Sequence, residues 1–127
     1  MNELKNSDLK KVHNFRELKI WKESLVLVKN VYLLTSKLPK DEKFGLVSQI
    51  NRCAVSIPSN IAEGSGRTTE KEFLYFLNIA ISSSYELETQ LILIEDIFQI
   101  QTKSILMELE TLQKMIGAFK RILKTEK

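Results

Sequence analysis

The chain has 127 residues, 43% of them hydrophobic, which is enough for one domain with a core and too few for two. Its formal net charge is +3, and two prolines, four glycines and one cysteine favour long helices and exclude a disulfide framework. The first residues lack the apolar run of a signal peptide, and no stretch approaches the ~18 apolar residues that span a bilayer. We therefore expect a cytoplasmic protein without membrane contact.

Residues 1–14 show no sustained hydrophobic period, so we predict a flexible N-terminal arm there and one domain over residues 15–124. The first predicted helix covers residues 16–38 and ends before Pro39, which disfavours helical geometry in the preceding residue. Its main apolar stripe, at spacings of three and four, consists of Leu18, Trp21, Leu25, Val28, Tyr32 and Thr35. A second set widens this stripe: Ile20, Leu27, Val31, Leu34 and Leu38.

The second predicted helix covers residues 41–63 and contains Pro58. Its apolar side is predicted to hold Phe44, Val47, Ile50, Ala54, Ile57 and Ile61. This apolar phase continues past Pro58, so we predict one kinked helix, with a break at Ser56 or Ile57 as the alternative. Gly64 is expected to end the helix in a left-handed conformation, and Gly66 to complete the turn.

A second side of this helix is polar but almost uncharged, and we call it the polar strip: Gln49, Arg52, Ser56, Asn60 and Glu63. Exposed helix faces are usually rich in Lys and Glu, whereas amides and hydroxyls both donate and accept hydrogen bonds. Short groups of that kind suit a surface that meets another protein surface, where unpaired polar atoms are costly. The polar strip is therefore a candidate subunit interface, and the alternative is a solvated face with few charges.

The third predicted helix covers residues 70–99 and the fourth covers residues 103–124. Thr69 and Glu72 form a capping-box pattern at the start of the third helix, and Glu88 on its edge is a possible partner for Arg52. The core positions expected in the third helix are Phe73, Phe76 or Leu77, Ala80, Ser84, Leu87, Leu91, Ile94 and Phe98. Those of the fourth are Leu106, Leu109, Leu112, Ile116, Phe119 and Leu123, and Gly117 is interpreted as a close helix crossing.

Four helices with short links predict an all-α, antiparallel up-down-up-down four-helix bundle. In that topology the starts of the first and third helices meet the ends of the second and fourth. The cations gathered at this end form the basic pole, which we predict to contact nucleic-acid phosphates: Arg16, Lys19, Lys22, Arg67, Lys71, Lys120, Arg121 and Lys124.

No catalytic or metal-binding pattern is found in the sequence, and we expect no cofactor and no enzymatic activity. A di-iron bundle needs Glu-x-x-His on two helices, whereas this chain has one histidine, His13, in the predicted arm. Cys53 is interpreted as a small buried residue and not as a nucleophile paired with His13. The GSGR segment at residues 64–67 is interpreted as a turn that ends a helix. Phosphate binding by its glycines is the less favoured alternative.

Four segments in order carry a family resemblance: FRELKIW, FGLVSQINRCAVSIPSNIAEGSGR, EFLYFLNIA and SSSYELETQL. They are similar to the bacterial four helix bundle proteins related to the 23S rRNA intervening-sequence proteins, and the resemblance covers residues 15–123. It implies a homopentameric ring without established enzymatic activity. A relative in that group, the accessory variability protein of diversity-generating retroelements, binds nucleic acid and a reverse transcriptase.

Two functions follow from the residues and the resemblance together. The first is a homo-oligomeric module that binds structured RNA or DNA through the basic pole. The alternative is a protein–protein scaffold, or an accessory subunit of a larger complex such as a retroelement reverse transcriptase, without a direct nucleic-acid role.

Overall fold

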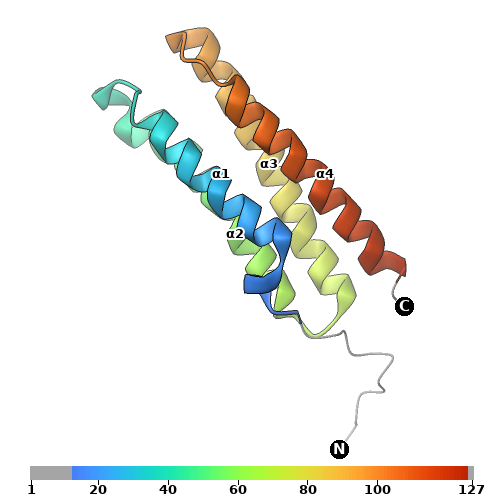
Figure 1. Cartoon of the computed structure of the whole chain (residues 1–127). Coiled ribbons are helices and arrows are strands. Elements are labelled where there is room, and N and C mark those ends of the chain that lie inside the picture. Colours follow the sequence, from blue (N-terminus) through green and yellow to red (C-terminus); the bar gives the residue numbers. More distant parts are fainter. Residues whose placement is uncertain (1–12, 126–127) are drawn as a thin grey trace, which may run out of the picture.

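The structure, a computed structural model, describes residues 13–125, with the exception of the Lys43 side chain. Within this range the chain is all-helical and contains no strand. Its four α-helices are α1 (Lys19–Thr35), α2 (Ser48–Ser65), α3 (Glu70–Phe98) and α4 (Lys103–Thr125). Consecutive helices run in opposite directions, and α4 returns beside α1 (Figure 1). The predicted all-α, up-down-up-down arrangement of four helices is confirmed.

The core side of α1 differs from the prediction. Ile20, Leu27, Val31 and Leu34 are buried, together with Ser24 and Thr35. In the predicted main stripe only Thr35 is buried. Tyr32 is exposed, and the other four residues are partly buried. Both sets have helical spacing, and the set expected to widen the stripe provides the core.

A π-helical turn, Lys43–Val47, precedes α2 and changes the phase of the apolar pattern. A π turn contains more residues than an α turn, so positions before it do not continue the α-helical stripe that follows. Phe44, predicted on the core side with Ile50, is instead 89% exposed. The second helix also begins at Ser48 and not at residue 41, because two short helical turns occupy the intervening segment.

Helix α2 passes through Pro58 without a break. The alternative of a break at Ser56 or Ile57 is therefore wrong. Near the end of the helix, Gly64 lies inside α2, and no described glycine has a positive φ. A Cβ atom at Gly64 would lie 2.8 Å from both Phe73 Cδ1 and Phe76 Cβ. Gly64 therefore permits close packing of α2 against α3, and the predicted left-handed helix end at this position is wrong.

Helix α3 begins as predicted, because the Thr69 hydroxyl accepts a 3.1 Å hydrogen bond from the Glu72 backbone N–H. Its buried side includes Phe73, Leu77, Ala80, Ser84, Leu87, Leu91 and Ile94, which confirms most of the expected stripe. Helix α3 ends at Gln99, which has left-handed φ/ψ values of 57° and 35°. The turn to α4 is held by Glu95 Oε1, which accepts hydrogen bonds from the Thr102 N–H and hydroxyl at 3.1 and 3.0 Å.

Helix α4 buries Ile105, Leu109, Leu112, Ile116 and Leu123. Of the residues expected in its core stripe, Leu106 and Phe119 are only partly buried. Gly117 does not mark a close crossing, because the nearest atom to an added Cβ would be the Arg121 Nη1 of the same helix at 3.7 Å. None of the helices in residues 13–125 combines the length and hydrophobicity needed to cross a membrane.

Candidate nucleic-acid interface

The basic pole lies where four helix ends converge. The starts of α1 and α3 and the ends of α2 and α4 lie at the same end of the bundle (Figure 1). The segments that carry the eight predicted cations therefore come together, with Arg67 and Lys120 partly buried and the other six exposed. Exposed cations on four neighbouring segments can contact several phosphates of one nucleic acid.

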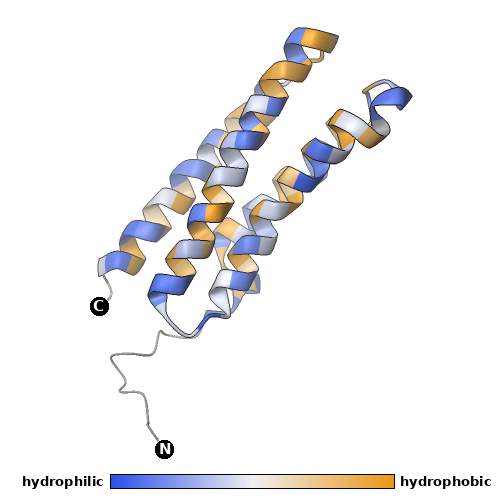
Figure 2. Ribbon diagram, turned by 180° about the vertical axis from the view of Figure 1, so that it is seen from behind, coloured by the Kyte–Doolittle hydropathy of each residue, from blue (hydrophilic) through white to orange (hydrophobic). Residues whose placement is uncertain are grey.

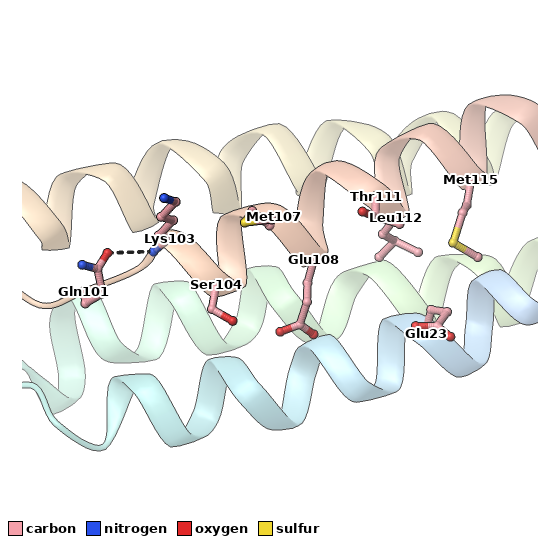
Figure 3. A pocket seen from close by; sticks show the side chains of 9 residues that line it. All are labelled: Glu23, Gln101, Lys103, Ser104, Met107, Glu108, Thr111, Leu112 and Met115. Carbon is pink, nitrogen blue, oxygen red and sulfur yellow. Dashed lines mark hydrogen bonds between the residues drawn. The ribbon is translucent and has the colours of Figure 1, made fainter.

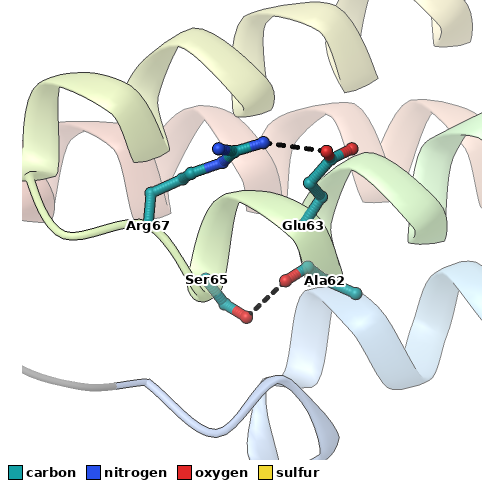
Figure 4. A network of polar contacts seen from close by, with 4 residues as sticks. All are labelled: Ala62, Glu63, Ser65 and Arg67. Atoms are coloured by element: carbon teal, nitrogen blue, oxygen red, sulfur yellow. Dashed lines mark hydrogen bonds and ion pairs between the residues drawn. The ribbon is translucent and has the colours of Figure 1, made fainter.

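Arg67 contacts two neighbouring side chains, Glu63 and Phe76. Its Nη2 atom lies 2.8 Å from Glu63 Oε1 (Figure 4), and its guanidinium lies 4.6 Å from the centre of the Phe76 ring. The carboxylate neutralises part of its charge, and the ring holds the guanidinium plane in place. The turn that carries Arg67 is fixed by hydrogen bonds from the Ser65 hydroxyl to the Ala62 carbonyl and from the Gly66 N–H to the Glu63 carbonyl. Arg67 is thus partly buried and paired within the chain, whereas Lys71 on the next helix is exposed.

His13 lies at the same pole, and the sequence did not predict its position. Its side chain is 14% exposed and packs edge-on against Phe73 of α3 and Phe119 of α4. The Nε2 atom lies 3.9 Å from Glu70 Oε1. The prediction of a flexible arm over residues 1–14 is therefore wrong for His13, and residues 1–12 of that arm lie outside the described part of the chain. No sequence pattern links His13 to Phe73 or Phe119, so this contact could not be predicted from the sequence.

The polar strip of α2 divides into two groups. Ser56 and Asn60 are partly buried: the Ser56 hydroxyl lies 2.8 Å from the Ser83 hydroxyl of α3, and Asn60 Nδ2 donates to the Ser56 carbonyl and hydroxyl at 2.8 and 3.0 Å. The Ser56 hydroxyl thus joins α2 to α3, whereas both Asn60 hydrogen bonds stay within α2. Gln49, Arg52 and Glu63 are exposed. The structure contains a single chain, so the role of the polar strip as a subunit interface stays a prediction.

The suggested pairing of Arg52 with Glu88 is wrong. Glu88 Oε1 accepts a 3.0 Å hydrogen bond from Gln113 Nε2 of α4, so this carboxylate lies on the opposite side of α3 from α2. Gln113 also donates to the Ser84 hydroxyl at 3.2 Å. Arg52 forms no salt bridge within residues 13–125. It instead lines an open groove of about 510 Å³ between α2 and α3, with Gln49, Ser83 and Glu86 among its neighbours.

Cys53 has the environment of a structural residue. Its Sγ atom donates a 3.0 Å hydrogen bond to the Ser83 carbonyl. Burial raises the pKa of the Cys53 thiol to about 12, and the negative charge of Glu86 adds to the shift. Cys53 contacts Ser83 of α3, whereas His13 contacts Phe73 of the same helix. These two positions on α3 are about 15 Å apart at 1.5 Å per residue. The thiol therefore stays protonated at neutral pH and does not meet the histidine.

A groove of about 690 Å³ lies between α1 and α4. Figure 3 shows Met107 and Met115 along its α4 side, with the Glu108 carboxylate directed towards α1. Both oxygens of Glu108 accept hydrogen bonds from Asn30 Nδ2 at 2.9 Å. Across the described residues, no three His, Cys, Asp or Glu side chains are placed to hold a metal ion. The Asn30–Glu108 contact thus joins α1 to α4.

The antiparallel arrangement of four helices places this chain in the class of four-helix bundle proteins. The family model of the 23S rRNA-intervening sequence protein matches residues 16–118, and the chain belongs to this family. A similar solved structure is a protein of unknown function from the S23 ribosomal protein family of Bacteroides thetaiotaomicron. It has 26% sequence identity and a TM-score of 0.73, and the match covers 80% of this chain and 97% of that chain. No curated protein matches the chain.

Proposed function

We propose that the protein is a non-enzymatic, homo-oligomeric bundle that acts in the cytoplasm and binds structured nucleic acid through the basic pole. The observation that carries this proposal is the convergence of four cation-bearing segments at one end of the molecule. The chain belongs to a family whose description refers to 23S ribosomal RNA, and this supports RNA as the ligand. The five-membered ring implied by the sequence resemblance is part of the proposal. Several copies would present several basic poles, so individually weak phosphate contacts would act together.

The charge distribution supports the pole as the contact surface. Helix α3 carries six carboxylates and one Lys, a net charge of −5, whereas α4 carries five cations and two carboxylates, a net charge of +3. A nucleic acid that lay along the side of α3 would meet repulsion. The end of the bundle, where Lys71 and the last turns of α4 lie, presents cations from different helices.

The test is a titration of fluorescently labelled hairpin fragments of 23S ribosomal RNA at two salt concentrations. The variant Lys71→Gln/Lys124→Gln removes two exposed cations of the basic pole. The control Lys37→Gln/Lys103→Gln removes two exposed cations at the opposite end of the bundle, with the same change in net charge. We expect the pole variant to bind RNA more weakly. The slope of its log binding constant against log salt concentration should become shallower by about one unit for each lost phosphate contact. Equal binding by both variants, or no binding of the unmodified protein at low salt, would overturn the proposal.

A second function, a protein–protein scaffold or an accessory subunit of a larger complex, is favoured by the apolar side chains that the single chain leaves exposed. Tyr75 and Ile97 on α3 are 62% and 61% exposed. Co-expression with a genomically neighbouring protein, followed by capture of the tagged chain, tests this alternative. Recovery of a stoichiometric complex from a sample without bound RNA would favour it over the first function.

A further inference from the structure

An open pocket of about 410 Å³ lies at the start of α3, beside the link from α2. We call it the aromatic pocket, and it is lined by Arg67, Lys71, Glu72, Tyr75 and Phe76. It belongs to the basic pole, because Arg67 and Lys71 are two of the eight cations there. The link between α2 and α3 is white to blue in Figure 2, so the two aromatic residues adjoin a hydrophilic segment. The pocket therefore combines aromatic rings with positive charge at the surface.

Tyr75 and Phe76 form the aromatic wall of this pocket. Their ring centres lie 5.4 Å apart and the ring planes are 84° apart, which is an edge-to-face contact. Phe76 is partly buried, and its Cβ atom packs closely on Gly64 of α2. Tyr75 is 62% exposed. The Phe76 ring thus packs against the protein, whereas most of the Tyr75 side chain is open to a planar ligand.

Two cations flank these rings in different ways. The Arg67 guanidinium lies 4.6 Å from the centre of the Phe76 ring and pairs with Glu63, yet 39% of the Arg67 side chain stays exposed. Lys71 precedes Tyr75 by four residues, so the two side chains are neighbours on one side of α3, about one turn apart. Within the described residues, no salt bridge joins Lys71 to a carboxylate. Its ammonium group is therefore available to a phosphate beside the Tyr75 ring.

Glu72 is the carboxylate among the lining residues, and it is held towards the start of the helix. Its Oε1 atom accepts hydrogen bonds from the Thr69 hydroxyl at 3.2 Å and from the Thr68 hydroxyl at 3.4 Å. The carboxylate is thus part of the cap of α3. With two cations and one carboxylate, the lining of the pocket keeps a net charge of +1.

We propose that the aromatic pocket binds one unpaired base of the nucleic acid, which stacks on the exposed ring of Tyr75 while the adjoining phosphate contacts Lys71. This inference rests on the proposed function and names the ligand class of the basic pole: a stem or hairpin with an unpaired nucleotide. Every base has a flat π surface, and unpaired bases in loops and bulges can turn out onto aromatic side chains. A fully paired helix keeps its bases stacked inside, so it would meet only the cations.

The test compares two RNA hairpins that differ by one base. Both have a bulge of one nucleotide at the same place in the stem, which is an adenosine in the first hairpin and an abasic site in the second. Fluorescence anisotropy should give about tenfold tighter binding of the adenosine hairpin, the scale expected for one base stacked on an aromatic ring. The ratio of the two affinities should stay nearly constant between two salt concentrations, because stacking releases no counterions.

Substitutions at Tyr75 assign this ratio to the pocket. Tyr75→Ala should bind both hairpins equally, whereas Tyr75→Phe should keep the difference because the ring remains. The matched control is Tyr85→Ala, since Tyr85 is 58% exposed further along the same helix. Lys71→Gln should weaken the binding of both hairpins alike. Circular dichroism checks the fold, and Tyr75→Leu, which keeps apolar bulk without an aromatic ring, replaces Tyr75→Ala if the alanine variant fails to fold.

The outcomes separate this inference from the proposed function. Equal binding of the two hairpins by the unmodified protein would overturn the inference, and so would a difference that survives Tyr75→Ala. In either case, weaker binding by the pole variant Lys71→Gln/Lys124→Gln would leave the proposed function standing. If neither hairpin bound at low salt, the proposed function would be overturned, and this inference with it.

Discussion

Gly64 of α2 packs directly against Phe73 of α3, with a Cβ atom at position 64 placed 2.8 Å from Phe73 Cδ1. The same atom would lie 2.8 Å from Phe76 Cβ, which cannot move away without a shift of the α3 backbone. We therefore expect Gly64→Ala to lower the free energy of unfolding by about 1–3 kcal/mol, as overpacking of a core does. Urea unfolding followed by circular dichroism, at one fixed protein concentration, measures the change.

Gly66→Ala is the matched control for this prediction. Gly66 has φ −87°, which alanine adopts without strain, and the atom nearest to an added Cβ is the Glu63 carbonyl oxygen at 3.7 Å. Alanine there restricts the unfolded chain, so stability should stay equal or rise by about 0.4–1 kcal/mol. Equal stability of the two variants would show that the α2–α3 contact is looser than the structure has it.

Loss of the Thr69 cap should destabilise α3. The Thr69 hydroxyl accepts the Glu72 N–H at 3.1 Å, one of the N–H groups that a helix start leaves without an intrahelical partner. We expect Thr69→Ala to cost about 1 kcal/mol and Thr69→Ser to restore most of it. Thr68→Ala serves as the control, because its exposed hydroxyl makes only a 3.4 Å contact with Glu72 Oε1. A Thr68→Ala variant as unstable as Thr69→Ala would contradict the capping role.

The main elements could be predicted from the sequence because their signals are local. The Thr69–Glu72 spacing located the start of α3, and the long stripe of α3 and α4 defined most of their core positions. The core side of α1 could not be predicted in the same way. Its stripe through Trp21 and Leu25 is as regular as the set through Leu27 and Val31, and only packing against the other helices decides which is buried.

Two further features, one of the fold and one of the candidate site, could not be predicted from the hydrophobic pattern. The π-helical turn at residues 43–47 shifts the phase of the second helix, so an α-helical wheel placed Phe44 on the wrong side. His13 joins the basic pole through aromatic contacts with Phe73 and Phe119, which are distant in sequence. The cations of the pole, by contrast, followed from topology alone once four antiparallel helices were predicted.

The Cys53 thiol should be unreactive in the folded protein. Burial raises its pKa from 9.0 to about 12, so at pH 8 almost no thiolate is present in the folded state. Labelling with a thiol reagent at pH 8 should be slow in buffer and complete within minutes in denaturant. Rapid labelling of the folded chain would contradict the buried hydrogen bond to Ser83.

The same shift predicts a loss of stability at alkaline pH. The folded thiol pKa is raised, so its contribution is fully present below the unfolded value of 9.0 and is lost as the pH rises towards about 12. Between these values the unfolded chain releases the Cys53 proton and the folded chain keeps it. The Cys53→Ala variant lacks this titration, so its stability should fall less between pH 9 and pH 11 than that of the unmodified protein. Parallel pH profiles of the two proteins would exclude a raised thiol pKa.

Arg52 should contribute to assembly and very little to the fold. It is exposed on α2, lines the groove that Glu86 also lines, and forms no salt bridge within residues 13–125. Its side chain therefore has little to stabilise inside one chain, whereas a second copy packed on the polar strip would bury it. We expect Arg52→Ala to change the unfolding free energy of the separated chains by less than about 0.5 kcal/mol. The concentration at which the assembly dissociates should rise about tenfold, as for a buried interface arginine.

Asn60→Leu provides the comparison within the same polar strip, because Asn60 is partly buried and donates hydrogen bonds to Ser56. This substitution should also weaken assembly more than it weakens the fold, since both bonds lie within one helix turn and the Ser56 hydroxyl keeps its contact with Ser83. Lys114→Ala on the outward side of α4 should alter neither quantity, because the exposed Lys114–Glu110 pair contributes little. Sedimentation across a dilution series measures assembly, and urea unfolding of the dissociated chains measures the fold. If neither Arg52→Ala nor Asn60→Leu changed the assembly, the subunit interface would not lie on the polar strip of α2.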